Sequence, residues 1–414
     1  MKTLLILGGF PQMIDIVFTA REMGVKTIVV DNNKNSPAKK FADKSFDIST
    51  GEINKLVELC KKEKINGIFT GFEDFNIHIA CELCEKLNLP FYATKTQLEC
   101  VTNKLLFKEK CREYGIPVIE QYSVEQAVAL QKYPYIVKPV DSYGSRGITV
   151  CRNEDELNKG YLKAIGCSKT STAIIEKFVD YDYGTELFYT VVNGEIYLTA
   201  TADRYTVKNG ETTVPLPVAE VFPSRQRDKM ATELDENIRK MLCGMKIENG
   251  LVLIQSLFDG NDFYIYEMAF RFTGEQHYRL VLKQQGIDLA KMMINHALGE
   301  DISEYRTEKL ADKYFCYPSI NLALVLNQGK IMNISGLEKV YKIDEVISYN
   351  LTHSEKDVVA ASGDYSHMLI RINMVAKSYK ELCRAVKDVD DYVTVTSFDG
   401  EDMLSTHFRL LEEP

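Results

Sequence analysis

The sequence predicts an α/β fold that begins with a parallel sheet and continues as a mixed α+β region. Three observations support this prediction. The chain opens with a strand–helix–strand pattern, the alternation of strands and helices continues to about residue 95, and strands and helices then follow in mixed order. The length of 414 residues indicates two or three structural units rather than one.

The first strand is predicted at residues 2–7, and it ends at the glycine pair Gly8-Gly9. A helical pattern follows through Met23, and a second strand, VKTIVVD, ends at Asp31. A glycine turn before a helix, with an acidic residue after the second strand, resembles the Rossmann-like dinucleotide fold. The G-x-G-x-x-G spacing is incomplete, so a related sheet that has lost the NAD site, or that holds another small anion, is favoured over a NAD site.

The same alternation predicts the rest of the first unit. The loop that ends in Glu73 and Asp74 follows a strand, and it therefore lies at the edge where open α/β sheets bind ligands. Both carboxylates are candidate substrate-binding groups. The expected elements are strands at 46–48 and 67–70, and helices at 53–64 and 75–87.

Composition and charge argue against several classes of function. No apolar run approaches the roughly 20 residues that a membrane span needs. The net charge of −9, without a long basic cluster, argues against non-specific binding to nucleic acid. The ten cysteines are scattered, and the pair Cys81 and Cys84 has no second pair at zinc-site spacing. Reduced thiols of a cytoplasmic protein are expected, with a redox pair as the alternative.

The most informative motif is the stretch 134–150, PYIVKPVDSYGSRGITV. A strand at 135–137 delivers Lys138, Pro139 is expected to break the ladder because it has no N–H, and a strand resumes at 148–150. The loop between them is rich in glycine and hydroxyl groups. Glycine lets backbone N–H groups approach an anion and the lysine supplies a positive charge, so a flap that closes over phosphates is predicted. An ordinary hairpin is the alternative.

A second motif lies in the hairpin formed by strands at 251–258 and 263–270. Gln255 and Glu267 stand among apolar neighbours, and period-two alternation places Glu267, Ala269 and Arg271 on one face. Polar groups buried in this way need a partner, and Mg²⁺ prefers oxygen ligands of this kind. The alternative is a Glu267–Arg271 ion pair on a solvated face, which the apolar sequence FYIYEMAF disfavours.

The remaining elements complete the mixed region. The segment from Arg204 to Arg227 shows no clear periodicity and is predicted to cover a substrate, with Arg204 and Arg225 as candidate contacts. Asn193-Gly194 predicts a tight hairpin turn. The other expected elements are helices at 97–114, 229–245 and 379–389, strands at 172–179, 320–326 and 368–376, and a hairpin at 186–201.

Four motifs in this order resemble the ATP-grasp superfamily, in particular carbamoyl-phosphate synthetase, biotin carboxylase and the purine-pathway carboxylate–amine ligases. They are VTNKLLFKEKCREYGIPV, YIVKPVDSYGSRGITV, IIEKFVDYDYGTEL and the hairpin with Gln255 and Glu267. The resemblance covers nearly the whole chain. It implies a Rossmann-like domain at 1–95, an ATP-grasp domain at 96–300 with a lid at about 115–178, and a C-terminal α/β extension at 301–414 that completes the catalytic part.

The resemblance also implies the site. Lys104 and Lys138 would hold phosphates under the loop 142–147, Glu176 with the backbone of Lys177 and Val179 would bind the adenine edge, and Glu186 would approach the ribose or the lysines. Gln255 and Glu267 would bind the metal, and Arg271 and Lys138 would be catalytic. The implied nucleotide-binding set is Lys104, Lys138, Ser142, Gly144, Ser145, Gly147, Glu176, Lys177, Phe178, Val179 and Glu186.

One residue departs from the family pattern. Ala269 stands where the family usually carries an asparagine, which removes one oxygen ligand and leaves open whether one or two metal ions bind. The resemblance implies a ligase that uses ATP and Mg²⁺, with Mn²⁺ as an alternative, to join a small carboxylate to an amine through an acylphosphate. The alternatives are a nucleotide-binding protein without turnover and a ligase like phosphoribosylglycinamide synthetase. A homodimer is left open.

Overall fold

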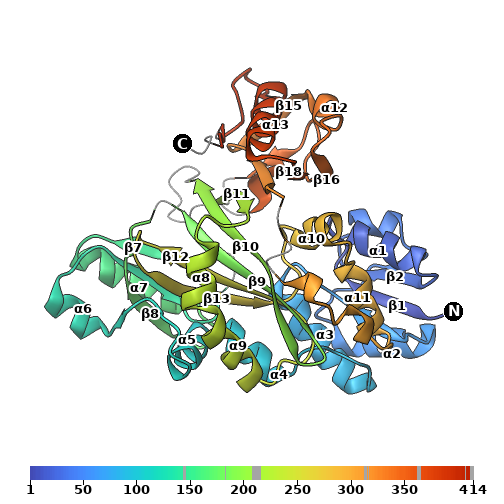
Figure 1. The fold of residues 1–414 in the computed structure, drawn as a ribbon, viewed down its shortest axis with the longest axis horizontal. Coiled ribbons are helices and arrows are strands. Elements are labelled where there is room, and N and C mark those ends of the chain that lie inside the picture. Colours follow the sequence, from blue (N-terminus) through green and yellow to red (C-terminus); the bar gives the residue numbers. More distant parts are fainter. Residues whose placement is uncertain are drawn as a thin grey trace.

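The computed structural model describes residues 1–142, 146–181, 183–207, 216–311, 315, 317–360, 365–405 and 407–410. Figure 1 shows an α/β unit of N-terminal elements at one end, a small lid at the other, and a large sheet between them with the C-terminal elements beside it. The predicted fold class, α/β followed by α+β, is confirmed. The domain boundaries at 95 and 300 stay predictions.

The N-terminal unit is a four-stranded parallel sheet in the order β3-β2-β1-β4. Its strands are β1 (Thr3–Leu7), β2 (Lys26–Val30), β3 (Lys44–Phe46) and β4 (Gly67–Phe69), and its helices are α1 (Met13–Glu22), α2 (Ile53–Glu63) and α3 (Asp74–Leu87). The strand expected at 46–48 lies two residues earlier, because Phe46 already pairs with Val30 while Asp47 forms an ion pair with Lys39.

The single helix expected at 97–114 is two helices, α4 (Lys95–Thr102) and α5 (Lys104–Glu113). Asn103 between them has an extended backbone (φ −94°, ψ 112°), and its Oδ1 accepts from the N–H groups of Leu105 and Leu106. This is an N-cap, which starts a new helix. The helix expected at 229–245 is likewise divided, into α8 (Arg227–Glu233) and α9 (Asp235–Gly244).

The lid is a four-stranded antiparallel sheet in the order β5-β8-β6-β7. Its strands are β5 (Gln121–Tyr122), β6 (Tyr135–Pro139), β7 (Thr149–Cys151) and β8 (Ala173–Lys177), with helices α6 (Val124–Leu130) and α7 (Glu154–Cys167). Pro139 does not end the ladder as expected. It is the last residue of β6 and lies opposite Ala173 of β8, whereas pairing with β7 stops at Val137.

The large sheet is antiparallel, in the order β13-β12-β9-β10-β11-β14-β18-β16. One face packs on α4, α5, α9 and α13 (Tyr379–Tyr392), and part of the other on α10 (His277–Gln285), α11 (Leu289–Ala297) and the N-terminal unit. The strands are β9 (Gly184–Val192), β10 (Glu195–Val207), β11 (Leu216–Phe222), β12 (Gly250–Phe258), β13 (Phe263–Phe270), β14 (Ser319–Val325), β16 (Val346–Leu351) and β18 (Met368–Val375).

The predicted irregular segment after Arg204 is largely strand, because β10 continues to Val207 and β11 begins at Leu216. Residues 208–215 lie outside the described residues. The Asn193-Gly194 turn is confirmed, with φ of 48° and 81°. The remaining elements are β15 (Gly329–Ser335), β17 (Val358–Val359), β19 (Thr394–Ser397), α12 (Leu337–Val340) and the 3₁₀ turns Pro37–Lys40, Ser303–Tyr305, Glu308–Leu310 and Tyr365–His367.

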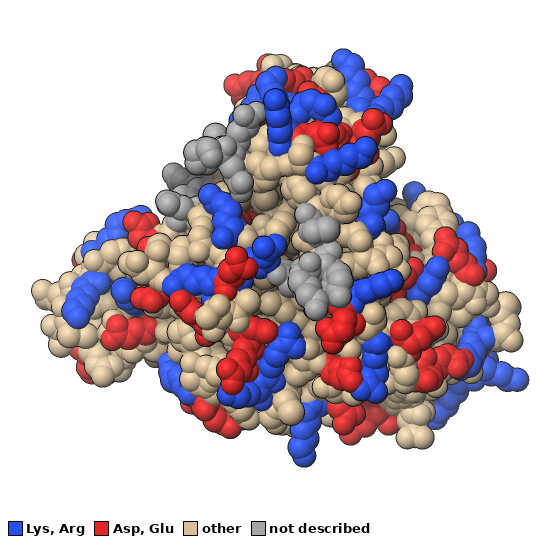
Figure 2. All heavy atoms as spheres, viewed as in Figure 1, with Lys and Arg blue, Asp and Glu red and all other residues tan. Residues whose placement is uncertain are grey.

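Two further observations concern the helices and the charged side chains at the surface. In the ranges that the structure covers, we find no helix with the length and apolarity that a membrane span requires. Lys and Arg side chains are interspersed with Asp and Glu side chains over the face drawn in Figure 2.

Candidate functional site

A buried cluster of two lysines and a glutamate links the lid to α5. Glu176 on β8 forms ion pairs with Lys138 on β6 (Nζ–Oε2 2.8 Å) and with Lys108 on α5. The Glu176 and Lys108 side chains are at most 1% exposed. Burial alone would raise the pKa of Glu176, but the two ammonium groups outweigh it and lower this pKa. Burial lowers the pKa of Lys108 to about 8, against the attraction of Glu176.

The lid sheet determines which way these groups point. Tyr135 and Val137 alternate with Lys138 along β6, and they belong to the apolar cluster under α6 and α7. Lys138 therefore lies on the opposite face, which it shares with Glu176 because Ile136 pairs with Glu176. This face looks toward β13, where Lys138 Nζ lies 5.6 Å from the centre of the Tyr266 ring.

Lys104 joins the cluster from the first turn of α5. Its Nζ donates to the carbonyl of Ser142 (3.0 Å), and its backbone N–H donates to the carbonyl of Val140 (2.9 Å), so the start of α5 is fixed to the flap. Burial lowers the pKa of Lys104, opposed chiefly by the carboxylate of Glu267. Lys104 thus lies within electrostatic range of both Glu267 and Lys138.

Part of the predicted flap can be placed. Ser142 Oγ donates to the carbonyl of Arg146 (2.8 Å). Gly147 has a φ of 82°, and a Cβ there would lie 2.7 Å from Pro139 Cγ, so this position requires glycine. Gly144 and Ser145, two other predicted loop residues, lie outside the described residues.

The hinge after β8 carries the residues predicted to bind adenine. The N–H of Lys177 donates to the carbonyl of Glu120 (3.0 Å), and the N–H of Phe178 to that of Pro134 (3.4 Å). Val179 is buried. The Glu176 carboxylate forms ion pairs with Lys108 and Lys138, and its contact with the adenine edge stays a prediction.

The predicted metal ligands face each other across the hairpin. Gln255 is the register partner of Glu267, and a bulge follows Gln255. Gln255 Nε2 donates to Glu186 Oε1 (2.6 Å), which leaves the amide oxygen of Gln255 for another partner. Glu267 is exposed and forms no ion pair with the residues that the structure covers. Among those residues, no three His, Cys, Asp or Glu side chains gather at one metal position.

Glu186 is predicted to approach the ribose or the lysines of the lid, and its contacts in the structure are with Gln255 and Arg204. It lies on β9 between Gln255 and Arg204, whose Nε is 3.4 Å from Glu186 Oε1. The reason is the sheet register, which pairs Glu186 with Gln255 on one side and with Ala202 on the other. Burial raises the pKa of Glu186 to about 7, opposed by Arg204.

Arg271 binds Asp74 rather than Glu267. Its Nε and Nη2 donate to the two carboxylate oxygens (2.6 and 3.1 Å), and Nη1 donates to the carbonyl of Phe272 (3.1 Å). Asp74 opens α3, and the N–H of Phe72 nearby donates to the carbonyl of Phe272 (3.0 Å). The loop before α3, which carries the predicted substrate groups Glu73 and Asp74, therefore lies against the end of the hairpin formed by β12 and β13.

The other substrate candidates have structural partners. Glu73 caps α3 by accepting from the N–H of Asn76 (3.1 Å). Asp31 accepts from the N–H of Gly9 (2.7 Å), so the glycine turn is bound within its own unit. Arg225 pairs with Asp203 (2.8 Å) and lies 4.2 Å from the centre of the Tyr183 ring.

Sequence reasoning missed several charged residues of this region. Lys108 could have been found, because it lies one helical turn after Lys104. Glu220, Glu275 and Arg371 gave no comparable signal, since they come from separate elements that only the sheet brings together.

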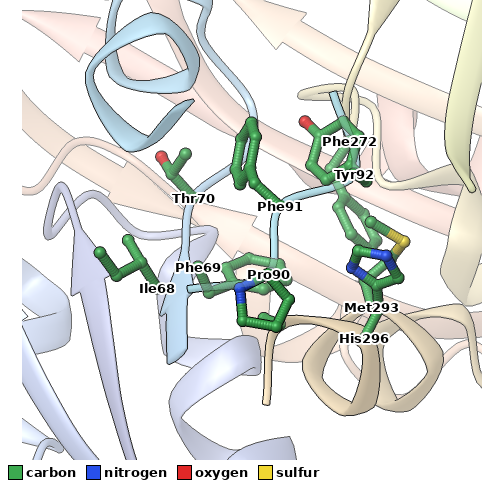
Figure 3. A pocket seen from close by; sticks show the side chains of 10 residues that line it. Ile68, Phe69, Thr70, Pro90, Phe91, Tyr92, Phe272, Met293 and His296 are labelled. Atoms are coloured by element: carbon green, nitrogen blue, oxygen red, sulfur yellow. The ribbon is translucent and has the colours of Figure 1, made fainter. Parts of the chain in front are cut away.

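Two hollows of the described structure lie away from this cluster. Figure 3 shows a mainly apolar cavity between the N-terminal unit and α11, lined by residues such as Phe69, Phe91 and Met293. Its volume of about 10 Å³ corresponds to roughly one water molecule. The other hollow, about 480 Å³, runs along α3 and α4 beside His78, Glu82 and Lys95, and it contains none of the predicted site residues.

Comparison with known proteins identifies two parts of the chain. The family model "Carbamoyl-phosphate synthase L chain, ATP binding domain" matches residues 103–305, and the model "PylC-like, N-terminal domain" matches residues 4–88. A formate-dependent phosphoribosylglycinamide formyltransferase of Sulfurisphaera tokodaii is 28% identical over 189 residues, 44% of this chain and 48% of that protein. The carbamoyl phosphate synthase large chain of the same organism is 26% identical over 368 residues, 81% of this chain and 34% of that protein. The chain thus spans about half or less of these relatives.

Solved structures match over almost the whole length. An L-amino acid ligase from Bacillus licheniformis has a TM-score of 0.77 at 18% identity and covers 96% of this chain and 99% of its own. Phosphoribosylglycinamide synthetase from Anaerococcus prevotii has a TM-score of 0.74 at 18% identity, with the same coverage. Biotin carboxylase from Campylobacter jejuni has a TM-score of 0.75 at 21% identity and covers 97% and 92%. These similarities establish the fold.

Proposed function

We propose that this chain, which belongs to the ATP-grasp superfamily, is an ATP- and Mg²⁺-dependent ligase that joins a small carboxylate to an amine and releases ADP and phosphate. The observation that carries the proposal is the position of two lysines on the face of the lid toward β13. Lys138 Nζ lies 5.6 Å from the ring centre of Tyr266, the residue before Glu267, and Lys104 Nζ donates to the Ser142 carbonyl of the flap. Two cations beside an exposed carboxylate suit a metal–triphosphate complex, whose phosphates need positive charge and whose metal needs oxygen ligands.

The nucleotide would lie between the lid and the large sheet. Lys104 and Lys138 would hold the phosphates, and Ser142, Gly144, Ser145 and Gly147 would close over them. The hinge backbone at Lys177, Phe178 and Val179 would receive the adenine. Glu176 would act through Lys138, since both of its oxygens are engaged by lysines.

The residues at the metal hairpin fit a hard cation. Glu267 offers an exposed carboxylate, and Gln255 offers an amide oxygen because its Nε2 is bound to Glu186. Mg²⁺ held there would neutralise phosphate charge during transfer. Mn²⁺ is an alternative ion with the same ligand preference. Because Ala269 offers no oxygen, water or a nearby group would have to supply the remaining ligands.

Arg271 is the proposed catalytic arginine. A guanidinium has five N–H donors, and Asp74 and the carbonyl of Phe272 use three of them. The remaining two would stabilise the transferring phosphoryl group or the acceptor carboxylate. Despite the opposing effect of burial, Asp74 raises the pKa of Arg271, so the side chain stays charged.

The reaction would proceed in two balanced steps. A carboxylate oxygen of the substrate attacks the γ-phosphorus of ATP, and the bond from that phosphorus to the β-γ bridging oxygen breaks, which yields an acylphosphate and ADP. The amine then attacks the acyl carbon, loses a proton and expels phosphate. The protein positions the reactants and offsets charge, so no side-chain nucleophile is required.

Two other functions remain candidates on specific observations. Ala269, in place of a ligand, favours a protein that binds nucleotide without turnover. The similarity to phosphoribosylglycinamide formyltransferase and synthetase favours a purine-type ligase. A homodimer and a cytoplasmic location are also proposed, the latter because most of the described cysteines are buried and scattered over separate elements, as expected of reduced thiols.

The test is ADP release from MgATP with pairs of carboxylates and amines. We expect release only when both members of the right pair are present. Lys138→Met and Glu267→Gln should each reduce the rate by 100-fold or more, about 3 kcal/mol of transition-state stabilisation. Lys159→Met, at an exposed position of α7, is the matched control and should keep the rate. Full activity of Glu267→Gln would contradict the metal assignment.

A further inference from the structure

A row of polar side chains crosses one face of the large sheet. Most members are register partners on neighbouring strands. Glu186 and Arg204, which lie opposite Ala202 and Gly184, are diagonal neighbours, so all the side chains share that face. The row begins at the proposed metal hairpin and ends in the C-terminal strands. Its members are Glu267, Gln255, Glu186, Arg204, Glu220, Asn321 and Asn373.

Charge along the row is incompletely balanced. Arg204 Nε lies 3.4 Å from Glu186 Oε1. Arg371 Nη1 lies 3.7 Å from Oε1 of Glu275, a residue of the segment between β13 and α10. Arg371 also donates to Asn321. Three carboxylates, Glu186, Glu220 and Glu275, thus face two guanidinium groups, and Glu220 is the one left over.

Glu220 is 1% exposed, and neither of its carboxylate oxygens has a hydrogen-bond partner among the residues the structure covers. It cannot turn away, because Ala219 and Val221 on either side point into the apolar cluster under α13. Arg204 is its direct partner on β10, yet the ion pair of Arg204 is with Glu186. A buried carboxylate without a partner is costly and indicates a missing cationic group.

An ammonium group fits this position better than a metal ion. The register neighbours of Glu220 offer a divalent cation no further oxygen, because one is Arg204 and the amide oxygen of the other, Asn321, accepts from Arg371. The Arg204 side chain is 16% exposed, so part of it reaches solvent. A carboxylate opposite a guanidinium matches the ammonium and carboxylate groups of an amino acid.

We propose that Glu220 binds the ammonium group of a substrate, with Arg204 beside it, so that one of the two substrates of this ligase is an amino acid. This inference rests on the proposed function and specifies its substrate class. Burial, with Glu186 and Glu275 nearby, raises the pKa of Glu220 well above its usual value in the unliganded protein. A bound ammonium group would offset that effect.

The test measures thermal stability of the full chain with MgADP and each of the twenty protein amino acids. We expect at least one amino acid to raise the Tm further, and its α-hydroxy acid analogue to have no effect. Glu220→Gln keeps the size of the side chain but not the charge. It should weaken amino acid binding by about 100-fold or more and leave the MgADP shift unchanged.

Glu195→Gln is the matched control. Glu195 is the first residue of β10, at the other end of the strand from Arg204, and it pairs with Arg306 at the surface. Glu195→Gln should bind the amino acid as the unaltered chain does. Glu220→Asp, which keeps the charge on a shorter side chain, should lose only part of the affinity, and this variant also controls for folding. Glu220→Gln itself should fold, since it removes a buried unpaired charge.

Four results would overturn the inference. They are equal amino acid binding by Glu220→Gln and the unaltered chain, equal binding of the α-hydroxy acid, a Glu220-dependent shift with Mg²⁺ alone, and no shift with any of the twenty amino acids. None of these four results contradicts the proposed function. That function fails only if MgADP does not stabilise the chain or if no carboxylate–amine pair releases ADP.

Discussion

Glu176 is the residue on which the basic cluster of the lid depends. It is buried between Lys108 and Lys138, and only Lys138 of these two is a proposed phosphate contact. A buried ion cluster contributes little net stability, but loss of one member leaves uncompensated charge. We therefore propose that Glu176 positions Lys138 through their ion pair.

Glu176→Gln tests this role. Two ammonium groups would remain without their carboxylate, so we expect a loss of about 3 kcal/mol in the free energy of unfolding, measured by urea denaturation. The KM for ATP should rise at least 10-fold. Glu109→Gln, at an exposed position of α5, should change neither quantity. A normal KM for ATP in Glu176→Gln would contradict the positioning role.

The lowered pKa of His277 predicts how the free energy of unfolding depends on pH. The ring is buried against Phe188 (4.3 Å between ring centres), and burial lowers the pKa of His277 to about 4. The unfolded chain binds its proton near pH 6.5, so the unfolded state binds more protons between pH 6.5 and 4. Stability is therefore complete above pH 6.5 and falls toward pH 4, by about 3 kcal/mol at most.

His277→Asn should flatten this pH dependence of the unfolding free energy. The measurement is chemical denaturation at pH 4.5, 5.5 and 7. His296→Asn, in which a less buried histidine is replaced, serves as a comparison and should flatten it less. An unchanged slope in His277→Asn would show that other groups cause the acid sensitivity.

At the scale of elements, the break at Asn103 matters most. A continuous helix over 97–114 would direct Lys104 differently, whereas the N-cap starts α5 at Lys104 and ties it to the flap through Val140 and Ser142. We therefore expect the position of Lys104, a proposed phosphate-binding lysine, to depend on the capping amide of Asn103.

Asn103→Ala should cost about 1 kcal/mol of stability through loss of the cap. It should also raise the KM for ATP several-fold, because the start of α5 frays. Ser123→Ala removes the cap of α6, which lies in the lid away from the lysine cluster, and should cost similar stability without the change in KM. Equal KM values for the two variants would argue against a role for the helix break.

Elements with local sequence signals were predictable, whereas those that depend on distant residues were not. Hairpins with strong turn signals, such as Asn193-Gly194, and buried strands such as β1 were predictable because their patterns are local. The break at Asn103 was missed because helical periodicity continues across it. The Glu186 contacts could not be predicted, since they depend on the register of β9 with β10 and β12.

At the scale of the whole molecule, two ion pairs connect the N-terminal unit to the large sheet and the helix that follows it. Asp74 binds Arg271, and Asp15 on α1 binds Arg279 on α10. The N–H of Phe72 adds a backbone contact to Phe272. The N-terminal unit thus contacts Arg271, the proposed catalytic arginine, directly.

A double-mutant cycle with Asp74→Asn and Arg271→Lys measures the strength of this contact. The pair is bidentate and largely buried, so we expect a coupling energy of about 1.5–3 kcal/mol in the free energy of unfolding. The same cycle with Glu22→Gln and Lys291→Met, an exposed pair 3.5 Å apart, should give less than about 1 kcal/mol. Additive effects for Asp74 and Arg271 would show that the two units are energetically independent.

The central claim is that a carboxylate is activated by phosphoryl transfer from ATP, and oxygen transfer tests it most directly. With a substrate whose carboxylate carries ¹⁸O, the acylphosphate route leaves one carboxylate oxygen on the released phosphate. The phosphate formed with MgATP and the productive amine should therefore carry one ¹⁸O atom per turnover, and ADP should be the nucleotide product. Unlabelled phosphate, or AMP as the product, would contradict the account.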